Sequence, residues 1–207
     1  MTKNLIKYAF RMVHIDNIPH VLSYGFVHKD SPNANPNYIP IGDQSVIDVR
    51  ETKCLKGGEK IGSYIPFYFG PRSPMLYVVQ HGYNGVKQYE PRELVYCVVR
   101  ICDLIEKNVS CMFTDGHALN FLTSTYQKED LTRINEIICY SDVYAQFWIS
   151  EEDRDLKRKK EAELLVKDEL GPQFVKGFIV YDSIAKDKLT GFGVNPDMVV
   201  VKSAYYF

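Results

Sequence analysis

The sequence predicts an α+β fold in which a mixed β-core carries short helices between its strands. Apolar, β-branched and aromatic residues gather in short runs, such as ELVYCVVR at 93–100. Short segments with helix signals separate these runs, without the regular alternation of a β-α repeat. Hydrophobic residues make up 45% of the 207 residues, enough for a sizeable core, and no internal repeat or linker divides the chain. A single domain over residues 1–207 is therefore expected.

The first third of the chain is predicted to hold a strand, a helix and a long loop. Residues 7–14 (KYAFRMVH) are typical of a strand. A helix is expected over 16–25, because Asp16 is a good N-cap and Gly25 a good C′ residue. Residues 29–62 are rich in Asn, Pro and Gly, and so long a connection is expected to be a functional loop with short helical turns.

The middle of the chain is predicted to alternate strands and helices. The apolar run YIPFYF at 64–69 indicates a buried strand, and 73–82 a helix with Pro near its start and Gly near its end. Residues 93–100 contain Val, Tyr and Cys without a breaker, which favours a strand. Another strand is expected at 109–115, followed by a helix over 117–126.

The last third is predicted to consist mainly of strands. A short helix at 142–148 precedes a charged, exposed connection at 150–160. Strands are expected at 161–166, 174–181 and 197–207, with a helix over 183–193 before the last of them.

Charge and cysteine usage narrow the class of protein. The net charge is −1, so any affinity for nucleic acid must come from a local basic patch. The five cysteines form no C-x-x-C pair and no Cys/His cluster, so no metal is expected. No secretory signal pattern and no apolar run of about 18 residues is present, which predicts a soluble cytoplasmic protein without a membrane partner. The usual phosphate-binding glycine loops are also absent.

Two carboxylates follow a block of four cations. The cations at 157–160 precede Glu161 and Glu163, which open the apolar run AELLV and would share one face of a strand. An unpaired buried acid is costly, so such a residue is expected to be paired, hydrogen-bonded or functional. Glu163, between Ala162 and Leu164, lies deeper in the run and is the stronger candidate.

Four further patterns contain candidate residues, although each alone is at least as often structural or surface-exposed as functional. One is FYFGPRSPMLY at 67–77, whose aromatics are more often core but whose G-P-R-S-P insertion is unusual inside a core run. Arg11 and His14 lie in FRMVHIDN, with Asn17 just beyond; Arg50 lies in the long loop; His117 follows an Asp-Gly turn signal in FTDGHA.

Together these blocks resemble the DarT family of bacterial toxins, which are DNA ADP-ribosyltransferases. The resemblance covers nearly the whole chain and rests on FRMVHIDNIPHVLSYG, GSYIPFYFGPRSPMLY, MFTDGHA, DRDLKRKKEAELLV and GFIVYDS, of which the second block is the most specific. It implies an ADP-ribosyltransferase-like split, mixed β-core with short helices and a cleft for NAD, which would be the co-substrate.

The resemblance also implies roles for single residues. Glu163 would be the catalytic glutamate, and Arg50 would contact NAD and support catalysis. The remaining NAD-binding residues would be Arg11, His14, Asn17 and Tyr68, with Arg11 standing where many relatives carry His. The substrate-binding residues would be Met75, His117, Arg154, Lys157, Arg158, Lys159 and Lys160.

The implied reaction transfers ADP-ribose from NAD to a base of single-stranded DNA and releases nicotinamide. A base stacked in a duplex cannot reach the ribose, so an unpaired strand is expected, with thymidine the favoured base. A macrodomain antitoxin that removes the modification is the expected protein partner. Three alternatives stay open: a guanosine-modifying enzyme, a protein-arginine ADP-ribosyltransferase that uses the Glu161-x-Glu163 pair, and a module that binds NAD or nucleic acid without turnover.

Overall fold

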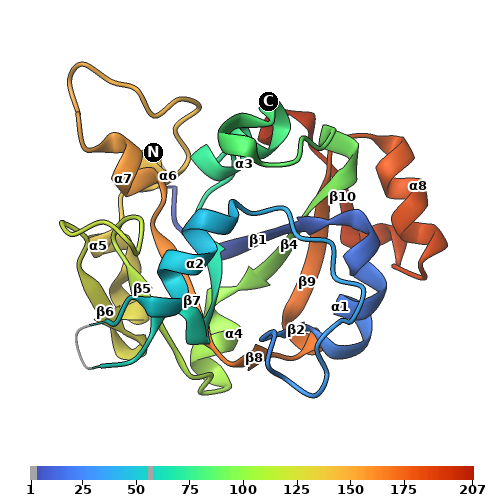
Figure 1. The fold of residues 1–207 in the computed structure, drawn as a ribbon, viewed down its shortest axis with the longest axis horizontal. Helices are drawn as coiled ribbons and strands as arrows, with labels where there is room; N and C mark the ends of the chain where they lie inside the picture. Colours follow the sequence, from blue (N-terminus) through green and yellow to red (C-terminus); the bar gives the residue numbers. More distant parts are fainter. Residues whose placement is uncertain (1–3, 56–57) are drawn as a thin grey trace.

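An eight-stranded sheet forms the centre of the computed structural model, which describes residues 4–55 and 58–207 (Figure 1). Its strand order is β10-β9-β4-β1-β3-β7-β5-β6, and β2 pairs with β8 in a separate two-stranded sheet. Among the described strands, β10 and β9 run parallel and all other pairs are antiparallel. The strands are β1 (Tyr8–His14), β2 (Phe26–Val27), β3 (Tyr64–Tyr68), β4 (Leu94–Arg100), β5 (Cys111–Thr114), β6 (Thr125–Gln127), β7 (Glu163–Lys167), β8 (Glu169–Leu170), β9 (Val175–Val180) and β10 (Val199–Val201).

Short helices connect these strands. The α-helices are α1 (Ile18–Tyr24), α2 (Gln44–Thr52), α3 (Pro74–His81), α4 (Ile101–Glu106), α5 (Ile134–Ile137), α6 (Tyr140–Val143), α7 (Leu156–Lys160) and α8 (Ser183–Gly191). Short 3-10 turns lie at η1 (Ile15–Asn17), η2 (Ile61–Ser63), η3 (Tyr83–Gly85), η4 (Pro91–Glu93), η5 (Lys128–Arg133), η6 (Pro172–Phe174), η7 (Pro196–Met198) and η8 (Ser203–Tyr205). Across residues 4–55 and 58–207, no helix has both the length and the apolar character needed to cross a bilayer.

The sheet separates two hydrophobic clusters. Along β1, Ala9 and Val13 belong to one cluster, whereas Phe10 and Met12 belong to the other, as the two-residue period of a strand requires. Helices α1, α4, α5 and α8 contribute to the first cluster, and α3 contributes to the second. Helix α2 contributes no buried residue, so it covers the protein without being part of its core.

The β-core is split between β1 and β3. These strands pair only where Phe10 lies opposite Tyr68, whereas β3 pairs with β7 along its whole length. Pro66 interrupts the ladder on the β1 side because it has no N–H to donate. Nη1 of Arg11 donates to the Pro66 carbonyl instead, at 2.9 Å. The side chain of Arg11 therefore replaces a strand contact at the point where the sheet opens, and the predicted split, mixed core is confirmed.

The predicted strands are confirmed, except that only Val199–Val201 of the strand expected at 197–207 is strand. The helix expected at 142–148 is also not formed over that range, because α6 ends at Val143.

Three connections differ from their predictions as well. Residues 117–126 form turns and the start of β6 rather than a helix. The side chains of His117 and Asn120 accept hydrogen bonds from backbone N–H groups two residues later, which stabilises turns in competition with a helix. The long loop contains the nine-residue helix α2, and the connection at 150–160 contains α7.

Two predictions about local chemistry also differ from the structure. Asp16 lies within η1 rather than capping a helix, and its N–H donates to Nδ1 of His14 at 3.2 Å. Glu161 is the C-cap residue of α7, with φ of −93° and ψ of 21°, and lies outside β7. It therefore does not share a strand face with Glu163, the first residue of β7. Gly25 has a φ of 73°, which confirms its role at the end of α1.

Candidate active site

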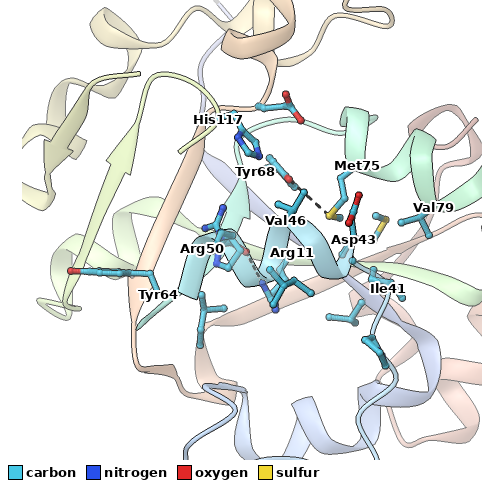
Figure 2. Close-up of a pocket in the computed structure, with 18 of the residues that line it drawn as sticks. Arg11, Ile41, Asp43, Val46, Arg50, Tyr64, Tyr68, Met75, Val79 and His117 are labelled. Carbon is cyan, nitrogen blue, oxygen red and sulfur yellow. Dashed lines mark hydrogen bonds between the residues drawn. The ribbon is translucent and has the colours of Figure 1, made fainter. Parts of the chain in front are cut away.

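A cavity of about 980 Å³ opens where β1 and β3 separate. Its walls come from these two strands, from α2 and α3, from the turn after β5 and from α7 (Figure 2). This volume is at the upper end of the range for small-molecule sites, about 300–1,000 Å³. The cavity can therefore hold a ligand of dinucleotide size.

Glu163 is fully buried and is not among the residues that line this cavity, but it contacts Arg50, which lines it. Its side chain has 0% exposure, and Nη1 of Arg50 lies 2.9 Å from Oε2 and 3.3 Å from Oε1. The N–H of Ala118 donates to Oε1 at 3.1 Å. The backbone of Glu163 is fixed as well, because its N–H donates to Oγ1 of Thr114 at 3.2 Å. A buried carboxylate is thus paired with a cation and a backbone donor.

Helix α2 positions Arg50. Asp43 caps the helix by accepting from the N–H of Ser45 at 2.9 Å, and Arg50 lies in its last turn. The helix packs closely on η2, because a Cβ on Gly62 would lie only 2.8 Å from Cα of Glu51. Nη2 of Arg50 is buried and has no hydrogen-bond partner among the described residues. A guanidinium nitrogen without a partner, on a residue that lines a cavity, is available to donate to a ligand.

Tyr68, Met75 and His117 lie on one side of the cavity (Figure 2). The hydroxyl of Tyr68 lies 3.9 Å from Sδ of Met75, and burial raises the pKa of Tyr68 well above its usual value. Burial also lowers the pKa of His117, which keeps its ring neutral near pH 7. Nδ1 of His117 accepts from the N–H of Leu119, so Nε2 carries the proton and is a donor. The site thus offers an aromatic face and a neutral donor.

The predicted NAD-binding residues of the N-terminal block separate in space. Arg11 lines the cavity, and its guanidinium lies 5.9 Å from the ring centre of Phe26. Asn17 also lines it and forms two hydrogen bonds with the backbone of Ile39, which fixes the loop at the rim. His14 is not among the lining residues; it is buried against Tyr89, with ring centres 5.1 Å apart. The structure therefore gives His14 a place in the core and no contact with the cavity.

The basic block divides into cavity residues and structural residues. Arg154, Lys157 and Arg158 line the cavity. Two of these, Arg154 and Lys157, have no ion-pair partner among the described residues, whereas Arg158 is paired with Asp115 at 2.8 Å and Asp155 at 2.7 Å. Positive charge available to a ligand is thus concentrated on Arg154 and Lys157.

Lys159 and Lys160 do not line the cavity. Nζ of Lys159 lies 2.7 Å from Oδ2 of Asp153. Lys160 is only 1% exposed, and its ammonium donates to the carbonyls of Pro71, Val143 and Ala145. Burial lowers the pKa of Lys160 to about 8. The prediction that Lys160 contacts the substrate strand is corrected by this placement, since its three donors are used to fix backbone.

The G-P-R-S-P segment holds the same region together. A Cβ on Gly70 would lie 1.9 Å from the carbonyl oxygen of Val143, so only glycine fits there. Arg72, with a φ of 53°, donates its N–H to the hydroxyl of Tyr96 at 3.0 Å. Ser73 then caps α3 by accepting from the N–H of Leu76 at 3.2 Å. This segment therefore fixes both α3 and the backbone that leads to α7.

Residue-by-residue sequence reasoning missed the part that α2 plays. Asp43, Val46 and Ile47 line the cavity beside Arg50, and Asp43 before a run of helix-forming residues was a recognisable N-cap signal. The N–H of Ala118 could not be found from any local pattern, because its partner Glu163 is 45 residues away.

Glu161 lines the cavity two residues before Glu163, and burial raises its pKa to about 7. The charge on Glu163 raises this pKa further, whereas Lys157 and Lys160 oppose the shift. The folded state therefore binds this proton more tightly than the unfolded state, whose carboxyl has a pKa of 4.5. Stability should consequently fall as pH rises between these two values.

The Glu161→Gln variant tests this pH dependence. The amide does not titrate, so the variant does not lose stability as the carboxyl of the wild type does. The melting temperature of the variant minus that of the wild type should therefore increase by a few degrees between pH 5 and pH 8. Thermal melts across that range measure the difference, with Glu169→Gln on the exposed position of β8 as the control. Parallel curves for the wild type and Glu161→Gln would contradict the assignment.

Comparison with known proteins identifies the family of this chain. A family model described as ssDNA thymidine ADP-ribosyltransferase, DarT, matches residues 10–207. A DNA ADP-ribosyl transferase-DNA ADP-ribosyl glycohydrolase fusion protein of Thermosipho africanus is 28% identical over 199 residues, which cover 96% of this chain and 48% of the relative. A DNA ADP-ribosyl transferase of Escherichia coli is 34% identical over 119 residues, which cover 56% of this chain and 55% of the relative. The chain spans about half the length of these curated relatives.

A solved structure shares the fold over the whole chain. The structure of Thermus sp. 2.9 DarT in complex with ADP-ribosylated ssDNA superposes with a TM-score of 0.82 at 23% identity, covering 100% of this chain and 99% of that protein. Because the family model matches all but the first nine residues, the chain belongs to the DarT family.

Proposed function

We propose that the protein transfers ADP-ribose from NAD to thymidine in single-stranded DNA and releases nicotinamide. The observation that carries this proposal is the buried Arg50–Glu163 pair, whose arginine lines a large cavity and has an Nη2 without a partner among the described residues. The activities that describe the matched family and its relatives point to the same reaction. The proposed transferase domain comprises the whole of residues 1–207 and acts in the cytoplasm.

The residues present fit NAD as the co-substrate. The guanidinium groups of Arg50 and Arg11 are always charged, and Nη2 of Arg50 has no partner among the described residues, so both groups suit the pyrophosphate or the ribose oxygens. Tyr68 offers an aromatic face and Met75 a polarisable thioether, which suit a flat nicotinamide ring. Asn17 holds the rim of the cavity in place through the backbone of Ile39.

The protein's part in the reaction is electrostatic and geometric. NAD supplies a ribose that becomes positively charged as the nicotinamide bond breaks, in the manner of glycoside cleavage. Glu163 places a fixed negative charge beside the cavity, in a site where burial strengthens its effect. Arg50 and the N–H of Ala118 fix that carboxylate before the substrate arrives, so little reorganisation is required. Glu163 is also the group proposed to take part in removing the proton from the acceptor base.

The substrate strand is proposed to cross the edge of the cavity formed by α7. Arg154 and Lys157 face it without an ion-pair partner among the described residues, so they are available to phosphates. Nε2 of His117 is a further neutral donor at this edge.

The salt dependence of DNA binding tests the role of these two cations. The Arg154→Ala/Lys157→Ala variant should bind an oligonucleotide more weakly and lower the slope of log K against log salt by about 1.4, at ~0.7 per phosphate contact on a single strand. Fluorescence anisotropy at several salt concentrations measures the slope. Lys159→Ala, which removes a paired cation outside the cavity, is the matched control and should leave the slope unchanged.

Mass spectrometry of a reacted oligonucleotide library tests the function itself. Purified protein, NAD and single-stranded oligonucleotides of mixed sequence should give a mass gain of one ADP-ribose on thymidine. Modification of guanosine would favour the alternative base. Labelling of protein arginine with no labelling of DNA would favour the use of Glu161 and Glu163 as an arginine-directed pair, and no nicotinamide release with any acceptor would overturn the proposal.

A macrodomain protein that removes the modification is the proposed partner. The Thermosipho africanus relative joins a DNA ADP-ribosyl transferase to a DNA ADP-ribosyl glycohydrolase in one polypeptide, so the two activities occur together in the family. Loss of the ADP-ribose mass from the reacted oligonucleotide on addition of such a macrodomain would support this pairing.

A further inference from the structure

Lys53 joins the two elements that hold the carboxylate of Glu163. It is the C-cap residue of α2, and its ammonium donates to the carbonyl of Leu119 at 2.5 Å, 66 residues away in the sequence. Leu119 lies in the turn after β5, directly after Ala118, whose N–H donates to Glu163. Arg50, which also donates to Glu163, lies in the last turn of α2. These contacts form a closed ring that runs from Glu163 through α2 and Lys53 to the turn and back.

Apolar packing and one backbone hydrogen bond hold the turn from its other sides. Ala118 belongs to a small hydrophobic cluster, and the N–H of His117 donates to the carbonyl of Arg158 at 3.1 Å. Hydrophobic contacts are not directional, so the cluster does not fix the direction of the Ala118 N–H. In the described part of the chain, Lys53 makes the only hydrogen bond between the end of α2 and this turn.

Lys53 itself lies outside the cavity. It is not among the lining residues, although Arg50 and His117, on the two elements that it joins, both are. A ligand in the cavity therefore meets Arg50 and His117 rather than this ammonium. Any effect of Lys53 on the reaction must pass through the groups that it holds in place.

We propose that Lys53 is a positioning residue for the reaction, because it keeps Arg50 and the Ala118 N–H on Glu163 before the substrate arrives. The inference rests on the proposed function, since it gives Lys53 a part in the same transfer. Stabilisation by a fixed charge requires that the groups around it need not reorganise, and a small displacement of a catalytic group lowers the rate strongly. Loss of this link should therefore lower kcat and leave the KM values for NAD and DNA unchanged.

Replacement of Lys53 by Met removes the ammonium and keeps most of the length of the side chain. The kcat of Lys53→Met should fall by about 10- to 100-fold, the scale of the loss when a catalytic group is displaced. Lys53→Arg keeps a charged donor and should recover most of the lost activity. Lys186→Met is the matched control, since Lys186 is also partly buried and donates to a backbone carbonyl, that of Val199 at 3.1 Å, away from the cavity. This control should retain the kcat of the wild type.

Hydrogen exchange of the Ala118 amide, followed by NMR, measures the link without using activity. In Lys53→Met this amide should exchange about tenfold faster than in the wild type, the value of one hydrogen bond from a charged group. Amides in β4 and β9 should keep their rates, because the rest of the sheet does not depend on Lys53. Lys186→Met should leave the rate at Ala118 unchanged.

The outcomes separate this inference from the proposed function. A wild-type kcat in Lys53→Met, or a lower kcat with unchanged exchange at Ala118, would overturn the inference and leave the function in place. Faster exchange throughout the sheet would show that Lys53 supports the fold in general, and a higher KM at unchanged kcat would show that it acts on binding; either result would overturn the inference. Faster exchange confined to the turn, in a protein that modifies no base, would support the link and overturn the function.

Discussion

Replacement of Glu163 by Gln is expected to abolish ADP-ribosyl transfer and leave the fold in place. The amide keeps the volume of the side chain. Its oxygen can still accept from the N–H of Ala118, which lies 3.1 Å from Oε1 of Glu163 in this structure. What is lost is the buried negative charge beside the cavity, which both stabilises the developing cation and handles the proton. We expect a decrease in kcat of about 10²- to 10⁴-fold, the range for a group that acts in proton transfer.

Nicotinamide release and the mass of the reacted oligonucleotide measure this loss independently. Glu169→Gln, which makes the same change on an exposed position of β8, should retain full activity. Melting curves of both variants confirm that the fold is intact. If Glu163→Gln still modifies DNA at a rate near that of the wild type, Glu163 has no part in the reaction and the site must be reassigned.

The strands were predictable because their signals are local. Runs such as those of β4 and β9 combine β-branched and aromatic residues, which are enriched in strands. The burial of Glu163 also followed from its neighbours, since an acid between Ala162 and Leu164 in an apolar run had to be paired. The partner of Glu163 could not be predicted from local sequence, because Arg50 is 113 residues away. The β3–β7 pairing and the packing of α2 on η2 bring Arg50 close to Glu163.

Charge patterns were the least informative part of the sequence. Four consecutive cations at 157–160 indicate one solvated face, yet they divide among a cavity wall, two ion pairs and a buried ammonium. The ammonium of Lys160 can be buried because it donates to the carbonyls of Pro71, Val143 and Ala145, which only the tertiary fold brings together. The burial of His14 also depends on the tertiary fold, because the ring of Tyr89 that lies against it belongs to a different segment.

Replacement of Arg50 by Met is expected to affect stability as well as activity. Glu163 has 0% exposure and Arg50 only 13%, so removal of the guanidinium leaves a carboxylate in the interior without its cation. Loss of one member of a buried pair typically destabilises a protein by about 3–5 kcal/mol. Unfolding by denaturant measures the loss, and Arg133→Met, at an exposed i,i+3 ion pair with Asp130, is the control that should change stability by less than about 1 kcal/mol.

The double variant Arg50→Met/Glu163→Gln separates the two roles of the pair. Stability requires only that no charge be left unpaired in the interior, so the double variant should be more stable than Arg50→Met alone. Catalysis requires the charges themselves, so the double variant should be as inactive as Glu163→Gln. A double variant that is no more stable than Arg50→Met would show that Arg50 supports the fold through its packing on α2 and η2, and that the ion pair with Glu163 exists for the reaction alone.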